Sequence, residues 1–324
     1  MLTSDSKNLK LLRYKGLAMV LIAATLWGLS GTVAQRLFQD EGFTPGWLVT
    51  MRLLISGILL LIIGGFRKNF NQVFAVWNAP QDRIRLVIFG IFGMLGVQYT
   101  YFAAIQTGNA ATATLLQYLA PLFIMIYLAV KYKGIPSIQE FIALGFALLG
   151  TFLLVTNGSI HHLSVSITSI AWGLSSAIAL AFYTLYPSNL LQRWGAEAII
   201  GWGMIIGGIA LCPIASPWQI QGQHWSVITG LFVSFVIIFG TLIAFYLYLD
   251  SLRYITPTEA SLLASAEPVS AVAASIIWLR LPLSLVEGLG GLCIISTVLM
   301  LLLFPKQPSK TLLNPTRDDN SSLR

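Results

Sequence analysis

The protein has 324 residues, of which 56% are hydrophobic and only 10% are charged, and its mean hydropathy is +0.79. Soluble domains carry about 25% charged residues, so this composition excludes an ordinary soluble domain and indicates a membrane protein. The net charge of +7 needs its own explanation, because a basic chain can also bind nucleic acid.

Long apolar runs follow one another along the chain. A helix that crosses the ~30 Å hydrocarbon core needs about 20 mainly apolar residues. Such runs lie at residues 17–37, 47–66, 84–106, 110–130, 138–156, 164–186, 196–216, 226–250, 258–278 and 284–304. We therefore predict an all-α polytopic membrane protein with ten transmembrane helices. Residues 1–16 are expected to be a cytoplasmic segment, and residues 305–324 a disordered cytoplasmic tail.

The positions of the basic residues predict the orientation of these helices. When the connections are numbered alternately from the N-terminus, one side receives 16 of the 19 lysines and arginines; the others are Arg36, Arg52 and Arg280. Cytoplasmic loops carry the excess of positive charge in membrane proteins. We expect a multi-pass protein of the plasma (inner) membrane with both termini in the cytoplasm, and no nucleic-acid partner.

The sequence gives no convincing sign of a signal peptide, a disulfide or a metal site. The first apolar run is too long for the core of a signal peptide and lacks a convincing cleavage site, so we interpret it as a helix. Cys212 and Cys293 lie inside predicted helices and form no disulfide framework or metal site. His161 and His162 fall in a loop without nearby acids, and we expect them to be solvated. No metal or cofactor is predicted.

The sequence repeats itself. "WGLS" at 27–30 returns at 172–175, and residues 93–121 align without gaps to residues 240–268, with eight identities in 29 positions. The two offsets, 145 and 147, agree with each other. We therefore divide the chain into two five-helix repeats, 17–156 and 164–304.

An odd number of spans in each repeat has a consequence for topology. The second repeat must enter the membrane from the opposite side, which relates the halves by an axis in the membrane plane. Inverted repeats of this kind are typical of secondary transporters, which bind substrate between the halves near the midplane. The repeat therefore points to a carrier that alternates between two open states.

These features resemble a known family. The "LWG" in the first span and the "Y…A-x-L-L…P" run across spans three and four, with its counterpart in the second half, are similar to the drug/metabolite transporter superfamily and within it to EamA-type permeases. The resemblance implies export of metabolites, often amino acids or toxic compounds, through a cavity lined by spans 1–4 and 6–9. Two features depart from it: Lys133 and Arg280 stand where many members have an acid, and the first span has no acid.

Glu267 is the strongest candidate for a functional residue. It lies at the middle of the ninth span, where a charged acid costs about 2.5–3.5 kcal/mol on insertion scales. An acid at this depth is expected to face a cavity or a partner. The alternative to a functional role is a structural one, in which Glu267 is hydrogen-bonded to a neighbouring helix. Pro268 follows it, and Pro121 stands at the equivalent position of the fourth span, so we predict a pair of hinges.

Further candidates are aromatic or polar residues within the spans. Tyrosines recur in pairs, 99 with 101 and 246 with 248, in the third and eighth spans. Aromatic walls with a few polar anchors are typical of small-molecule pockets, although ordinary packing explains most such residues. The predicted substrate-binding or coupling residues, besides Glu267, are Trp27, Arg52, Gln98, Tyr99, Gln117, Tyr118, Trp172 and Tyr246.

Arg52 has two interpretations. It lies six residues into the second span, about 8 Å below the outer boundary. Its long side chain can reach the interface by snorkelling, which we favour slightly over binding of a substrate carboxylate.

Other classes of protein were weighed against a carrier. The "GLSG" at 28–31 matches an intramembrane serine protease pattern, but the histidines lie in predicted loops and the motif is duplicated as a packing element. A scaffold would need long loops or an extra domain. No phosphate-binding loop occurs, so the energy must come from a gradient or exchange. We predict a non-enzymatic exporter of amino-acid-like or amphipathic metabolites in the lipid bilayer. Efflux of toxic compounds, proton coupling and a homodimer remain open.

Overall fold

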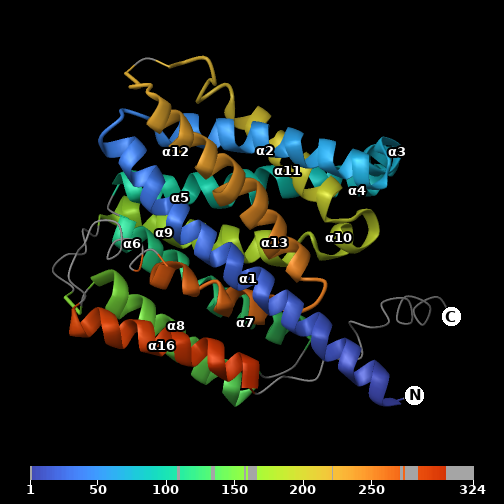
Figure 1. Cartoon of the computed structure of the whole chain (residues 1–324), viewed down its shortest axis with the longest axis vertical. Helices are drawn as coiled ribbons and strands as arrows, with labels where there is room; N and C mark the ends of the chain where they lie inside the picture. Colours follow the sequence, from blue (N-terminus) through green and yellow to red (C-terminus); the bar gives the residue numbers. More distant parts are fainter. Residues whose placement is uncertain are drawn as a thin grey trace.

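The structure is a computed structural model that describes residues 2–107, 110–132, 136–156, 158–159, 166–220, 222–270, 273 and 284–303. These residues form helices and connecting turns, and no strand occurs among them (Figure 1). The all-α class predicted from composition is therefore confirmed.

The first half of the chain contains α1 (Leu2–Gln39), α2 (Pro45–Lys68), α3 (Phe70–Phe74), η1 (Ala75–Asn78), α4 (Pro80–Ile88), η2 (Phe89–Leu95), α5 (Gly96–Thr107), α6 (Ala110–Gln117), α7 (Ala120–Tyr132) and α8 (Ile138–Thr156). The second half contains α9 (Ile167–Leu185), α10 (Ser188–Trp194), α11 (Ala196–Leu211), α12 (Val227–Ile237), η4 (Ile238–Ile243), α13 (Ala244–Ser251), α14 (Pro257–Leu263) and α16 (Leu285–Leu303). Residues 266–270 are also helical.

Six stretches of the described helices are long and apolar enough to cross a membrane: Leu11–Phe38, Pro45–Lys68, Pro80–Ala104, Ala113–Tyr132, Ile167–Trp194 and Val227–Ser251. Three shorter apolar helices are Ile138–Leu153, Ala196–Leu211 and Gly288–Met300. The predicted ninth span, 258–278, is described only as far as residue 270 and at 273. The structure is thus that of a multi-pass protein, while the count of ten helices stays a prediction.

Sequence signals at the helix starts explain several of these boundaries. Thr44 caps α2 by accepting the amide of Trp47 at 3.3 Å, and Pro45 occupies the first turn, where no amide donor is needed. Thr256 and Glu259 form a reciprocal capping box at the start of α14. Gly195 separates α10 from α11 with a φ of +85°, a conformation that glycine adopts without strain.

Helices α2 and α11 occupy equivalent positions in the two repeats, and they pack side by side. Gly46 of α2 lies against Ala215, just beyond the end of α11, whereas Gly64 of α2 lies against Glu197 at its start. Residue numbers therefore run in opposite directions along the contact, so the two helices are antiparallel.

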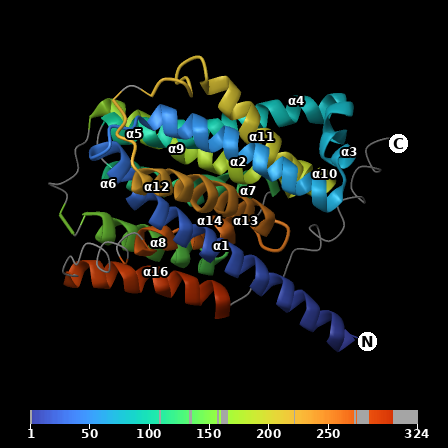
Figure 2. The same ribbon diagram turned by 45° about the horizontal axis from the view of Figure 1, so that its top comes forward.

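Helices α8 and α16 form a second pair of the same kind. Their bounds differ by the repeat offset of 147, and Figures 1 and 2 both show them side by side at one flank of the bundle. The Thr297 hydroxyl lies 3.3 Å from the Ala143 carbonyl, and Gly158 lies against Val286, so this pair is also antiparallel. We call the α2–α11 and α8–α16 contacts the two seams.

Each half of the chain contains a wide helical turn, which the hydropathy pattern does not predict. Residues Phe89–Leu95 and Ile238–Ile243 form π-helical segments, η2 and η4, within otherwise α-helical spans. Gly93 of the first segment aligns with Gly240 of the second in the sequence repeat. Such π segments occur often at functional sites because they release backbone groups from the regular pattern.

Three buried carboxylates join neighbouring helices through ion pairs. Asp82 of α4 accepts from Arg193 of α10 at 2.8 Å, and Glu259 of α14 accepts from Arg13 of α1 at 2.7 Å. Glu197 of α11 accepts from Lys68 of α2 at 2.7 Å. All three pairs lie at the end of the bundle that the positive-inside rule assigns to the cytoplasm.

The α8–α16 seam makes a prediction about packing. A methyl group on Gly150 would meet side-chain and backbone atoms of α16 at 2.7–3.0 Å, whereas Gly145 of the same helix has open space around it. We expect Gly150→Ala to destabilise the protein by about 1–3 kcal/mol through overpacking. The measurement is the melting temperature in detergent, with Gly145→Ala as the matched control that should not lower it. Equal melting temperatures for the two variants would show that the seam is not close-packed.

The buried ion pairs make a second prediction. Glu197→Gln leaves the amino group of Lys68 and the guanidinium of Arg67, which lie 2.7 and 3.3 Å from its carboxylate oxygens, without their anionic partner. We expect a loss of about 1–3 kcal/mol in the free energy of unfolding. Asp40→Asn breaks only the exposed 3.8 Å pair with Arg36 and should change stability little. The idea fails if both variants unfold at the wild-type denaturant concentration.

Candidate functional site

Two helix breaks face each other inside the bundle. The fourth span is interrupted at residues 118–119, between α6 and α7, and the ninth span at residues 264–265, after α14. Each break lies two or three residues before one of the predicted hinge prolines, Pro121 and Pro268. The structure therefore places an interruption where each proline was expected to cause one, while movement at these positions stays a prediction.

A tyrosine from one break binds the acid beyond the other. The hydroxyl of Tyr118 donates to Oε2 of Glu267 at 2.9 Å and also lies 3.2 Å from the carbonyl oxygen of Ala264. Pro268 has no amide hydrogen to give that carbonyl in the regular helical pattern. The carbonyl instead accepts from the Glu267 amide at 2.9 Å, and the tyrosine hydroxyl divides its single proton between this carbonyl and the Glu267 carboxyl group. Tyr118 and Glu267, both predicted site residues, are thus in direct contact.

Arg52 lies inside the bundle instead of reaching the membrane interface, so the favoured snorkelling interpretation is wrong. Only 7% of the residue is exposed. Its Nε donates to the hydroxyl of Thr241 at 2.8 Å, and its Nη2 lies 3.5 Å from the carbonyl oxygen of Gly240. Both partners belong to the π segment η4, whose polar groups take the place of the interfacial water that snorkelling would have reached.

A basic and an acidic side chain lie in this region without touching each other. The guanidinium of Arg52 and the carboxyl of Glu267 attract each other, although no ion pair within 4 Å joins them in the described part of the chain. Tyr101 lies near Glu267, and its hydroxyl shares a hydrogen bond of 2.8 Å with the hydroxyl of Thr114 on α6. We call Arg52, Tyr101, Tyr118 and Glu267 the central cluster. It combines an acid, a base and two hydroxyl groups contributed by different helices.

Three other predicted residues pack near the helices of the cluster. The indole of Trp27 lies between the rings of Phe245 and Tyr248, with centroids 5.1 and 5.2 Å away. The amide of Gln117 donates to the hydroxyl of Ser176 on α9 at 2.6 Å. Gln98 donates to its own helix, at the Met94 carbonyl. Their partners are protein groups, so a role in binding substrate stays a prediction for each.

The remaining predicted residues lie elsewhere. Tyr99 is 36% exposed and meets the ring of Trp172 edge-on, with centroids 6.1 Å apart. The hydroxyl of Tyr246 lies 3.5 Å from Glu197, within the ion-pair group at the end of α11. The structure does not bring these three residues into contact with Glu267.

In each tyrosine pair the other member belongs to the cluster or lies near it. Tyr101 is part of the central cluster, and Tyr248, whose hydroxyl is hydrogen-bonded to that of Thr184 at 3.0 Å, lies near Tyr118. Residues two apart on a helix point in directions about 200° apart, so only one of each pair can face the interior. Thr241 was not predicted either, because nothing in its local sequence signals a π turn.

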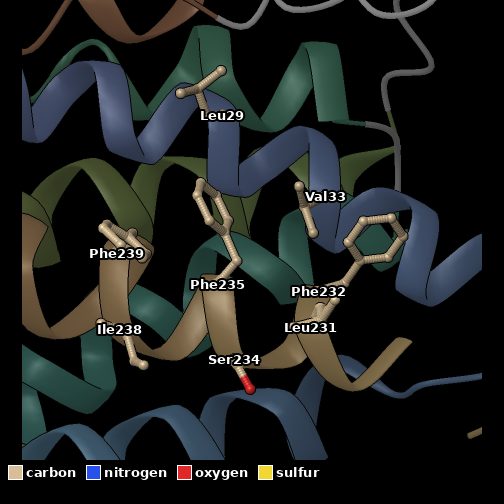
Figure 3. A pocket seen from close by; sticks show the side chains of 8 residues that line it. All are labelled: Leu29, Val33, Leu231, Phe232, Ser234, Phe235, Ile238 and Phe239. Atoms are coloured by element: carbon tan, nitrogen blue, oxygen red, sulfur yellow. The ribbon is translucent and has the colours of Figure 1, made fainter. Parts of the chain in front are cut away.

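An apolar groove lies between α1 and α12 with η4 (Figure 3). It has a volume of about 500 Å³ and is lined by Leu29, Val33, Leu231, Phe232, Ser234, Phe235, Ile238 and Phe239. The hydroxyl of Ser234 donates to the Gly230 carbonyl at 2.8 Å. None of the lining residues belongs to the central cluster, and the groove presents no charge with which to bind a polar solute. It is therefore not the candidate site.

The described residues contain no group of three or more histidine, cysteine or acidic side chains that could hold a metal ion. Cys212, directly after α11, and Cys293 of α16 are free thiols. The acid, the base and the hydroxyl groups of the central cluster can pair charges, form hydrogen bonds and exchange protons.

The repeated apolar helices and their antiparallel seams define a multi-pass membrane protein of the transporter type. The EamA-like transporter family matches residues 14–156 and again residues 167–303. The chain belongs to this family, which confirms the resemblance seen in the duplicated motifs.

Individual relatives of the chain are also named as transporters. A Salmonella typhimurium protein, the uncharacterized inner membrane transporter YicL, is 37% identical over 291 residues, covering 89% of this chain and 95% of the relative. The threonine/homoserine exporter RhtA of Escherichia coli is 28% identical over 302 residues, covering 91% and 94%. A crystal structure with 19% identity shares the fold with a TM-score of 0.73 and covers 89% of this chain and 96% of its own. The protein is therefore a membrane transporter of the EamA type.

The contact between Tyr118 and Glu267 predicts that removal of the Tyr118 hydroxyl lowers the stability of the protein, whereas removal of the Tyr99 hydroxyl does not. We expect Tyr118→Phe to lose about 1 kcal/mol of stability and a few degrees of melting temperature. The Tyr99 hydroxyl has no hydrogen bond to a described residue, so Tyr99→Phe should melt like the wild type. Scanning fluorimetry in detergent measures both, and an unchanged melting temperature for Tyr118→Phe would contradict the importance of this bond.

Proposed function

We propose that the protein is a secondary active exporter of small amino-acid-like metabolites that works by alternating access and uses Glu267 as its coupling group. In this proposal ten helices cross the inner membrane as two inverted five-helix repeats with both termini in the cytoplasm. The proton is the coupling ion, and Glu267 carries it.

The antiparallel seams support the inverted arrangement. A two-fold axis in the membrane plane turns a helix into an antiparallel copy of itself, so equivalent helices beside the axis must run in opposite directions. Helices α2 and α11 do so, as do α8 and α16. Transporters with this symmetry expose a central site to either side by rocking one group of helices against the other.

The observation that carries the proposal is the hydrogen bond between Tyr118 and Glu267. It joins the broken span of one half to the broken span of the other, at the depth where a substrate site is expected. A rearrangement of the halves changes this contact directly. When the Glu267 carboxyl group gains or loses a proton, its hydrogen bond to Tyr118 changes as well. Protonation is thereby coupled to the conformation of both breaks.

The amino-acid-like cargo is supported by the charges of the central cluster. An amino acid carries an ammonium and a carboxylate group, and the cluster offers Glu267 and Arg52 as complementary partners. Phosphorylated cargo would need several basic groups, and Arg52 is the one buried basic side chain among the described residues. RhtA, the relative named as an exporter of threonine and homoserine, agrees with this class of substrate.

The proposal predicts that Glu267→Gln abolishes export. Cells that overproduce the wild type, the variant or no transporter are compared by untargeted profiling of metabolites in the medium and the cytosol, at matched membrane levels. We expect a compound enriched in the medium with the wild type alone, because glutamine cannot carry the proton. Glu41→Gln, at the end of α1, is the matched control and should export normally.

Outcomes of this experiment separate the alternatives. Normal export by Glu267→Gln at all external pH values would refute the coupling role. A compound without an amino-acid-like structure would favour efflux of toxic compounds. Identical profiles in all strains would contradict a metabolite exporter.

A further inference from the structure

The wide turn η4 and the last residue of α12 before it present backbone and side-chain oxygens to the facing helix α2. The hydroxyl of Ser56 donates to the Ile237 carbonyl at 2.9 Å, and Arg52, one helical turn away, donates to Thr241 at 2.8 Å. The Thr241 hydroxyl in turn donates to the Val236 carbonyl at 2.8 Å. Thr241 therefore caps a loosened carbonyl and holds the arginine at the same time.

The guanidinium is held by its inner nitrogen. Nε has a good hydrogen bond and Nη2 only a long 3.5 Å contact, while Nη1 has no hydrogen bond to a described residue. The rings of Phe102 and Phe245 lie 6.0 and 5.7 Å from the guanidinium carbon and keep this end of the side chain in apolar surroundings. Arginine binds carboxylates through two parallel hydrogen bonds from neighbouring nitrogens, and the outer edge is the part of Arg52 that is left to do so.

From this geometry we infer that Arg52 is the subsite for the carboxylate group of an amino-acid substrate, and that Thr241 is the positioning residue that orients it. The inference rests on the proposed function. A buried guanidinium without an anion at ion-pair distance is costly, so a substrate carboxylate gains more here than it would at the surface.

The substrate class follows from the two charged groups together. Glu267 and Tyr118 receive the ammonium group, and Arg52 receives the carboxylate. An amine without a carboxylate leaves the arginine unsatisfied, and a simple carboxylic acid leaves Glu267 unsatisfied. Sites built to pair a polar group reject analogues that lack it, because their own buried groups then stay unpaired.

The test compares each of the twenty standard amino acids with its α-carboxamide, which has nearly the same shape but carries a neutral amide in place of the α-carboxylate. Binding to the purified full-length protein is measured by thermal stabilisation in detergent, titrated to give an apparent Kd. For at least one amino acid we expect binding, and we expect its amide to bind about tenfold more weakly or worse, as loss of a charge-assisted hydrogen-bond pair implies.

Variants of the π segment separate positioning from folding. Thr241→Val removes the hydroxyl that holds Nε and should weaken acid binding by about threefold to tenfold while leaving amide binding unchanged. Thr241→Ser keeps the hydroxyl and should restore the wild-type ratio. Ser56→Ala breaks the neighbouring bond to Ile237, at the end of α12, without touching Arg52 and should preserve discrimination.

Several results would overturn the inference. Equal affinity for an acid and its amide in the wild type excludes a carboxylate subsite, and equal weakening of both by Thr241→Val shows a purely structural role. Failure of all twenty amino acids to bind also refutes it. If the wild type still exports a compound in a Glu267-dependent way, the exporter proposal survives each of these results. If export is absent as well, both proposals fall.

Discussion

A membrane offers no water to a backbone carbonyl that leaves the helical pattern, so each such group needs a partner inside the protein. The described structure meets this constraint at the broken ninth span by bringing the Tyr118 hydroxyl to the Ala264 carbonyl and the Glu267 carboxyl together. It meets it at η4 by bringing Ser56 and Arg52 of α2 to the widened turn. The polar side chains of the central cluster are therefore also the groups that make an irregular backbone tolerable at this depth.

Sequence reasoning succeeded where a local pattern has one structural solution. Runs of about 20 apolar residues predicted helices, and the bounds of α8 agree with the predicted span. Prolines indicated where the two spans break, and two residues named separately, Tyr118 and Glu267, are in contact in the structure, although their role in binding or coupling stays a prediction. It failed where the outcome depends on a distant partner. Arg52 was expected to snorkel because the sequence around it shows no buried partner; its partner Thr241 lies 189 residues away. The choice between Tyr99 and Tyr101 depends on the rotation of the helix, which the repeat does not specify.

The two halves share a plan but contribute different chemistry. Both have a π segment and a broken span at equivalent places, and both place a tyrosine, Tyr101 or Tyr248, near the centre. The acid, however, comes only from the second half, where Glu267 aligns with Ala120 in the repeat. The base comes only from the first half. The symmetry thus supplies the scaffold, and departures from it supply the charges that a polar cargo requires.

The antiparallel seams have a consequence for how such a chain can arise. A contact between equivalent helices related by a two-fold axis is isologous, like the interface of a symmetric dimer: one surface needs only to fit a second copy of itself. A single five-helix unit, inserted into the membrane in both orientations, would satisfy that condition. Joining two units in one chain keeps the fit while releasing each copy from the need to be identical. An acid can then be acquired on one side and a guanidinium on the other, without either being placed opposite its own duplicate.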